Sequence, residues 1–148
     1  MKKVFVIIGL VLLVLFIVVF CYFFVGRAKP VEKIDFGITF SKIQAESLGL
    51  DWKETYLAIL DDLGVKKLRL IAYWPEIEPS KGNFDFKDLD WQIDEAQKRE
   101  AEVILAIGRR LPRWPECHVP EWAKNFSEKE QQERILIVIS EIVERYKN

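Results

Sequence analysis

The chain has 148 residues, of which 50% are apolar and 30% are charged. This composition excludes an intrinsically disordered chain, because such chains are poor in apolar and aromatic residues, and seven glycines with six prolines exclude a collagen-like sequence. Four of the 22 basic residues precede Pro30 and all 23 acidic residues follow it, so residues 30–148 have a net charge of −5. A mildly acidic segment without a basic stripe argues against nucleic acid as a partner.

The first segment runs from Val4 to Val25 and contains no charged residue in 22 positions. A helix needs about 20 such residues to cross the hydrocarbon core of a membrane. A cleaved signal peptide is the alternative, but its apolar core is usually ~7–15 residues long, and residues 25–28 make a poor cleavage site. We therefore predict a transmembrane signal anchor, with residues 1–29 forming the anchor and its flank.

The orientation of this anchor is weakly specified, because lysines before the apolar segment nearly balance the basic residues after it. The usual arrangement of a single N-terminal anchor places the remainder of the chain outside the cytoplasm. We therefore expect a single-pass membrane protein whose C-terminal part is extracytoplasmic.

Residues 30–148 repeat a strand–helix pattern three times. The predicted strands cover residues 34–40, 67–72 and 103–107, and the predicted helices cover residues 51–63, 86–100 and a segment from Ser127 to the end of the chain. Capping-box spacings at residues 51–54 and 127–130 indicate two of the helix starts. This alternation implies a parallel α/β sheet with right-handed crossovers.

The predicted strands begin near residues 34, 67 and 102, which is 33 to 35 residues apart, a spacing that suits a (β/α)8 TIM barrel and also an open doubly wound sheet. The long aromatic loops after the strands favour the barrel, and so does the lack of a glycine-rich phosphate loop at residues 39–42. We predict the first three βα units of a barrel within residues 30–148. The consecutive apolar residues 135–139 in the last helix further predict that more chain or a partner covers it.

Four side chains after or within the second and third strands are candidates for ligand binding. Arg69 alternates with leucines in its strand, so it would face the barrel interior and bind a carboxylate, or form an ion pair on the sheet surface. Trp74 offers a flat face on which a sugar ring stacks, or it packs its own loop. Arg109 and Trp114 lie in an arginine-rich segment that follows the third strand and would line an acidic or hydroxyl-rich cleft.

Other chemistry-bearing residues carry weaker signals. Glu76 and Glu78 are loop acids whose separation the sequence does not fix, so we assign them no catalytic role. Cys117 and His118 are too few for a structural zinc site, and sequence neighbours rarely have the geometry of a nucleophile and its base. We predict neither a metal nor a cofactor.

The second and third units contain motifs of a known enzyme clan. The motifs are L-R-L at 68–70, Trp74, I-E-P at 77–79, G-N-F-D-F at 82–86, L-D at 89–90, L-P-R-W at 111–114 and P-E-W at 120–122. They resemble the retaining TIM-barrel glycoside hydrolases that carry catalytic glutamates on strands four and seven. Within that clan the chain is similar to the N-terminal part of the family 42 β-galactosidases and of cellulase-like and xylanase-like relatives.

The resemblance implies a glycoside hydrolase that acts on an oligo- or polysaccharide. It implies that Arg69 supports the nucleophile and the substrate and that Trp74 and Trp114 lie near the sugar cleft, whereas Arg109 occupies a region where several of these families have histidine. Both catalytic glutamates would lie beyond Asn148, so we expect an N-terminal fragment without catalytic residues, inactive alone. The alternative is a non-catalytic, membrane-anchored module that binds carbohydrate or oligomerises.

Overall fold

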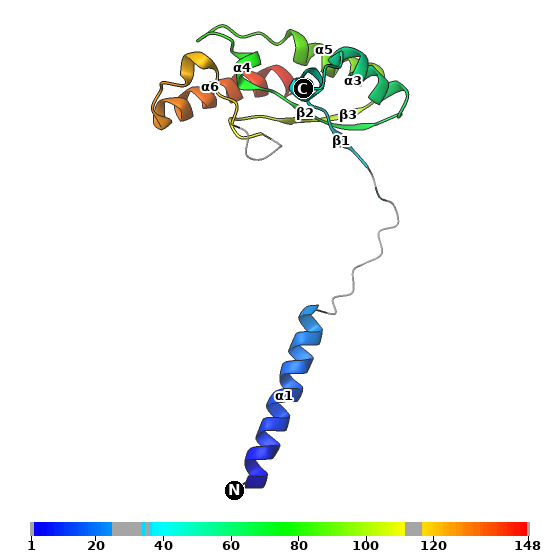
Figure 1. The fold of residues 1–148 in the computed structure, drawn as a ribbon, viewed down its shortest axis with the longest axis vertical. Helices are drawn as coiled ribbons and strands as arrows, with labels where there is room; N and C mark the ends of the chain where they lie inside the picture. The colour runs from blue at the N-terminus through cyan, green and yellow to red at the C-terminus, as the bar shows by residue number, and fades with distance from the viewer. Residues whose placement is uncertain (1, 25–33, 35, 112–116, 148) are drawn as a thin grey trace. The chain divides into compact units, whose positions relative to one another are not determined.

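The computed structural model describes residues 2–24, 34, 36–111 and 117–147 (Figure 1). Contacts divide the chain into two compact units, Met1–Asp35 and Phe36–Asn148. The described part of the first unit is dominated by one helix, and the second unit contains all of the described strands.

The helix of the first unit is α1 (Lys2–Phe24), and none of its residues is buried against protein. Phe16, Phe20 and Phe24 follow one another along one side, with centroid distances of 6.2 and 4.4 Å between successive rings. Within the described residues, α1 is the one helix long and apolar enough to cross a membrane. A signal sequence near the N-terminus has the same properties.

The second unit is built on a parallel sheet with strand order β1 (Ile38–Thr39), β2 (Lys67–Ile71) and β3 (Glu102–Ala106). In the register of the sheet, Arg69 lies between Thr39 of β1 and Ile104 of β3. The predicted parallel α/β arrangement is therefore confirmed. The first strand is shorter than predicted. Gly37 directly precedes it, and a Cβ atom added to Gly37 would lie only 2.9 Å from the Lys67 carbonyl oxygen.

Helices connect these strands and lie on one side of the sheet (Figure 1). They are α2 (Lys42–Ser47), α3 (Trp52–Asp61), α4 (Trp74–Ile77), α5 (Lys87–Lys98), the 3-10 turn η1 (Glu121–Ala123) and α6 (Glu128–Tyr146). The predicted caps are present: Asp51 accepts hydrogen bonds from the backbone N–H groups of Lys53 and Glu54, and Ser127 forms a capping box with Glu130. The sequence did not predict the short helices α2 and α4, since neither is long enough to show a helical period.

The hydrophobic core lies between the sheet and the helices. Leu68 and Leu70 point from β2 into this core and are almost fully buried. The helices contribute Tyr56 and Leu60 from α3, Leu89 and Ala96 from α5, and Val138 and Ile142 from α6. The opposite face of the sheet is open, with Arg69 exposed and the Ile104 side chain 69% exposed.

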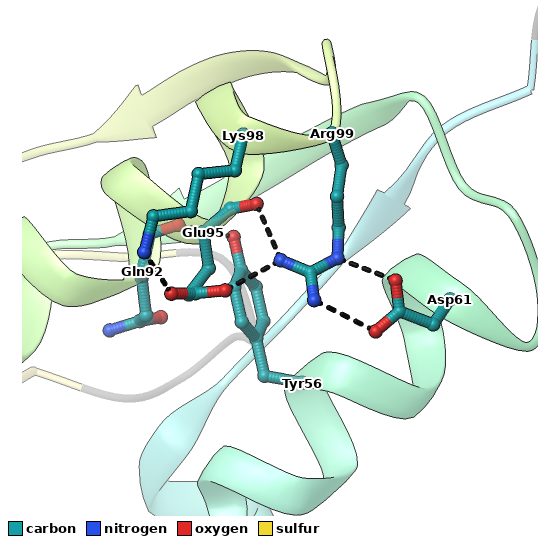
Figure 2. Close-up of polar contacts among 6 residues, drawn as sticks. All are labelled: Tyr56, Asp61, Gln92, Glu95, Lys98 and Arg99. Atoms are coloured by element: carbon teal, nitrogen blue, oxygen red, sulfur yellow. Dashed lines mark hydrogen bonds and ion pairs between the residues drawn. The ribbon is translucent and has the colours of Figure 1, made fainter.

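An ion-pair network joins α3 to the end of α5 (Figure 2). Arg99 donates from Nε and Nη2 to the two carboxylate oxygens of Asp61, at 2.5 and 2.8 Å, and from Nη1 to Glu95 at 2.5 Å. The hydrogen bonds from Arg99 hold the pKa of Asp61 below its usual value. Nearby, the buried Tyr56 hydroxyl donates to the Gln92 carbonyl at 2.8 Å. Because α5 ends just before β3 begins, this network lies near the amino ends of the strands. It links α3 to the end of α5.

Candidate functional site

Three polar side chains meet where the strands end, and we call Ser41, Tyr73 and His118 the strand-end cluster. Ser41 and Tyr73 follow β1 and β2, and their hydroxyl groups are 2.7 Å apart. His118 comes from the segment after β3, and its ring lies edge-on to the Tyr73 ring with centroids 4.6 Å apart. Carboxyl ends of parallel strands are where binding sites form in α/β folds, so this cluster marks the functional edge of the sheet.

Local structure explains how each member of the strand-end cluster is placed. Ser41 is the N-cap of α2 and accepts a hydrogen bond from the Gln44 backbone N–H at 3.1 Å. Tyr73 continues the alternation of Arg69 and Ile71 on the open face of the sheet.

The segment after β3 folds back on itself and brings His118 to the edge of the sheet. An antiparallel bridge joins Arg110 to Cys117. The His118 backbone N–H donates to the Arg109 carbonyl at 3.1 Å. A residue nine positions beyond Arg109 is thereby brought beside the end of β2.

Sequence reasoning missed this cluster. The S-x-x-Q spacing of residues 41–44 signals a capped helix, and strand alternation extended by two residues would have placed Tyr73 with Arg69. His118 was considered only as a metal ligand or a catalytic partner of Cys117. Nothing local signals that His118 returns to Tyr73, because that contact depends on a bridge across a long connection.

Arg69 lies on the open face of the sheet, in the middle of β2. Its side chain is exposed, and its Nε donates to the Thr39 hydroxyl of β1 at 2.9 Å. The adjacent strand presents Ile104 at the same level. The guanidinium therefore keeps further donors available for an anionic or hydroxyl-rich group above this face.

Arg109 is half-buried and held by the start of α6. Its Nη1 donates to the side-chain oxygen of Gln131 at 3.0 Å, and its Nη2 donates to Glu128 at 3.2 Å. Arg109 thus fixes the segment after β3 against α6, next to the strand-end cluster. Trp114 lies outside the described residues, so its expected place near a sugar cleft stays a prediction.

Trp74 occupies a different environment from the one expected of a residue in a sugar cleft. Its side chain is 0% exposed, its Nε1 donates to Glu78 at 2.9 Å, and its ring lies edge-on to that of Trp122. A fully enclosed indole has no face on which a sugar can stack. In this structure Trp74 is a core residue that holds the loop after β2, and the stacking role is corrected accordingly.

Glu78 is the acceptor at the centre of that core, although loop acids are usually solvated. It is 0% exposed and receives hydrogen bonds from Trp74, from the Gly82 backbone N–H and from Nε and Nη2 of Arg134 in α6. Burial raises the pKa of Glu78, but these hydrogen bonds outweigh burial and hold its pKa below the usual value. A carboxylate committed in this way is structural rather than catalytic.

Lys42 connects the loops after β1 and β2. Its Nζ donates to Glu76 at 2.8 Å and to Asp88 at 2.6 Å. Burial lowers the pKa of Lys42, but the two acceptors outweigh burial and raise its pKa, so it stays a cation. The three side chains border a cleft of about 270 Å³ between α4 and α5. Among the residues that the structure describes, no three His, Cys, Asp or Glu side chains are grouped so as to hold a metal ion.

Three parallel βα units with polar side chains at the carboxyl edge of the sheet are the kind of units from which (β/α)8 barrels are built. The family model of glycoside hydrolase family 42, described as β-galactosidase, matches residues 49–137. This match spans more than half of the chain, so the chain belongs to that family. The resemblance noted from the motifs of the second and third units is confirmed. No curated protein matches the chain in sequence.

One of two similar solved structures reaches a TM-score above 0.5 and shows the same fold over part of its length. The exo-β-1,4-mannosidase Op5Man5 from Opitutaceae bacterium strain TAV5 matches with a TM-score of 0.54 and 18% identity, over 74% of this chain and 22% of that chain. A polyextremophilic β-galactosidase from the Antarctic haloarchaeon Halorubrum lacusprofundi matches with a TM-score of 0.46 and 17% identity, over 74% and 18% of the two chains. The chain therefore spans about a fifth of the length of these enzymes.

Proposed function

We propose that residues 30–148 form the first three βα units of a glycoside hydrolase barrel and bind an oligo- or polysaccharide at the carboxyl ends of the strands. The observation that carries this proposal is the family match over residues 49–137, which spans β2, β3 and most of the intervening and following helices. The open face of the sheet, which carries Arg69, corresponds to the interior of a closed barrel.

Arg69 is the proposed substrate-facing cation, and Arg109 is proposed to support the same site. Arg69 has donors left for a ligand, since only its Nε is engaged, by Thr39, among the contacts that the structure describes. Arg109 supports the site from the α6 side through Gln131 and Glu128. Arg69 would orient hydroxyl or carboxylate groups above the sheet edge, and Arg109 would hold the adjoining segment in place.

Hydrolysis needs two carboxylates on either side of the glycosidic bond, about 5–5.5 Å apart in retaining enzymes. Glu78 is buried against Arg134, and Glu76 is paired with Lys42, so neither acid is placed for this work. We therefore propose that the catalytic pair belongs to further barrel units. By itself, this chain should bind sugar without cleaving it.

The proposed location follows from α1. Residues 1–29 would act as a signal anchor, since Lys2–Phe24 is long and apolar enough to span a membrane. A single N-terminal anchor usually leaves the following domain outside the cytoplasm. The glycoside hydrolase units would then face extracytoplasmic carbohydrate.

A galactose titration tests the binding proposal. The full chain in detergent micelles is labelled with ¹⁵N-arginine, and D-galactose is added while the side-chain Nε–H signals are followed. We expect a saturable shift of the Arg69 signal and none of the Arg99 signal, because Arg99 is engaged by Asp61 and Glu95 at the amino ends of the strands. Unchanged Arg69 and Arg109 signals at saturating sugar would overturn the proposal.

One observation favours the non-catalytic, oligomerising alternative. The Ile104 side chain of the open face is 69% exposed, and Leu136 of α6 is 64% exposed. Large apolar side chains that are exposed to solvent often mark surfaces that another chain covers. Sedimentation of the full chain in density-matched detergent separates the readings, because a stable dimer with no sugar-dependent Arg69 shift supports this alternative.

A further inference from the structure

A small cleft lies between α4 and α5, in the helical layer of the second unit. Its volume is about 270 Å³, and we call it the Lys42 cleft. Lys42, Glu76 and Asp88 supply charged groups at its border, and Ile77 and Leu89 are among the apolar side chains that line it. Ligand pockets usually have volumes of about 300–1,000 Å³, so this cleft has room for a ligand no larger than one small ring.

Gln92 of α5 lines the Lys42 cleft with an acceptor that is not used inside the protein. The residue is only 5% exposed. Its Nε2 donates to the Asp88 backbone carbonyl at 3.1 Å, which fixes the orientation of the amide. Among the contacts of the described residues, Gln92 Oε1 accepts no hydrogen bond, and this oxygen is not fully enclosed. An acceptor left without a partner in a buried side chain costs free energy, and a hydrogen-bond donor in the cleft would remove that cost.

Glu76 and Asp88 each keep one carboxylate oxygen for a ligand. Lys42 Nζ donates to Oε1 of Glu76 at 2.8 Å and to Oδ2 of Asp88 at 2.6 Å, and these ion pairs hold both carboxylates in place. The other oxygen of each carboxylate has no hydrogen bond within the described part of the chain. The Glu76 and Asp88 side chains are 32% and 45% exposed, so a ligand can reach them. With Gln92 Oε1, the cleft offers three oxygen acceptors.

Three acceptors beside apolar walls suit a ligand that carries several hydroxyl groups. Each hydroxyl donates one hydrogen bond to a carboxylate or amide oxygen, and the C–H surface of a sugar ring fits against apolar side chains such as Ile77 and Leu89. A metal ion fits poorly, because the Lys42 ammonium contacts both carboxylates and would repel a second cation there. The chemistry of the cleft therefore favours a neutral polyol over a cation.

We infer that the Lys42 cleft binds a neutral, monosaccharide-sized polyol through the carboxylates of Glu76 and Asp88 and the side-chain oxygen of Gln92. This inference goes beyond the proposed function, because neither Arg69 nor Arg109 lines the cleft. It adds a second sugar site to the chain, in the helical layer instead of on the open face of the sheet.

An NMR titration tests the site directly. The full chain in detergent micelles is labelled with ¹⁵N-glutamine and ¹³C-methyl isoleucine, and D-galactose, D-mannose or D-glucose is added. We expect at least one of these sugars to shift the Gln92 side-chain amide and the Ile77 methyl signals saturably. The amide of Gln97, which is exposed on the same helix and outside the cleft, should not respond. If no sugar shifts the Gln92 and Ile77 signals, or if only calcium chloride or putrescine does, the inference fails.

Two variants with matched controls identify the acceptors, with the Ile77 methyl signal as the readout. Gln92→Met keeps the length of the side chain and removes Oε1, so we expect about five-fold weaker binding, the effect of one neutral hydrogen bond. Asp88→Asn replaces a charged acceptor and should weaken binding about ten-fold. It lies at a half-exposed site, so it decides the question if Gln92→Met does not fold. Gln97→Met and Asp94→Asn make the same replacements at exposed positions of α5 and should leave the affinity unchanged. Equal losses in the controls would overturn the inference.

The Arg69 Nε–H signal, followed in the same titrations, separates this inference from the proposed function. If Arg69 responds to sugar and Gln92 and Ile77 do not, the cleft site is overturned and the proposed function stands. If Gln92 and Ile77 respond and Arg69 does not, the cleft site stands and binding at Arg69 fails. Gln92→Met should weaken the Ile77 response and leave the Arg69 response unchanged. Equal weakening of both responses would contradict a separate site in the cleft.

Discussion

Arg134 of α6 donates from Nε to Oε2 of Glu78 at 3.0 Å, and its Nη2 contacts the other oxygen of the same carboxylate. The two residues are 56 positions apart in the sequence. Trp122, in η1, adds a hydrogen bond from Nε1 to the Glu78 carbonyl at 3.0 Å. Glu78 thereby joins the loop after β2 to both elements that follow β3.

Arg134→Met should strongly destabilise the second unit, because it leaves the Glu78 carboxylate buried without its cation. We expect a loss of about 3–5 kcal/mol in the free energy of unfolding, measured by denaturant titration of tryptophan fluorescence. Glu121→Gln is the control, because it breaks only the exposed pair with Lys124 and should change stability by less than about 1 kcal/mol. A loss in Arg134→Met no larger than in the control would show that the pair is unimportant.

Acid should weaken the second unit through Glu78. Burial acts to raise its pKa, but hydrogen bonds led by that from Arg134 hold the folded-state pKa below the unfolded value of about 4.3. The stabilisation is therefore complete above about pH 4.3 and is lost as the pH falls through the folded pKa. Unfolding free energies measured from pH 7 to pH 3 should fall less steeply in Glu78→Gln than in wild type. Parallel curves for the two proteins would refute the assignment.

Trp74→Phe separates a core role from a sugar-stacking role. Because the indole is enclosed and donates to Glu78, its loss should lower the unfolding free energy by about 1–3 kcal/mol. Galactose affinity, measured by the Arg69 shift, should stay within about two-fold of wild type. Weaker sugar binding with unchanged stability would instead support the stacking role that the sequence suggested.

The sequence correctly predicted the features that depend on neighbouring residues, such as strand alternation and helix caps. Alternation in β2 correctly placed Arg69 on the face opposite to Leu68 and Leu70, the two leucines that the structure buries in the core. The caps at Asp51 and Ser127 were equally readable, because each depends on residues within one turn.

The features that the sequence could not predict depend on contacts between distant segments of the chain. Glu78 looked like a solvated loop acid because its partner Arg134 lies in another helix. Trp74 looked available to a ligand because no local period signals its contacts with Glu78 and with Trp122 of η1. The strand-end cluster depends in the same way on the return of His118 to Tyr73.

The anchor makes a separate prediction. If residues 1–29 remain as a signal anchor, the protein in cell membranes should resist extraction with alkaline carbonate and dissolve only in detergent. Sequencing of the mature N-terminus should then begin at or next to Met1. A soluble product that begins after Phe24 would identify α1 as a cleaved signal peptide.

We propose that this chain binds carbohydrate at its strand ends and that neither Glu76 nor Glu78, the acids of the loop after β2, is placed for cleavage. The most direct test follows p-nitrophenyl β-D-galactoside by NMR in the presence of the full chain in micelles. We expect saturation transfer from the protein to the galactoside ring, competed by D-galactose, with no release of p-nitrophenol over the uncatalysed rate. Release of p-nitrophenol by the chain, or an absence of competed saturation transfer, would contradict it.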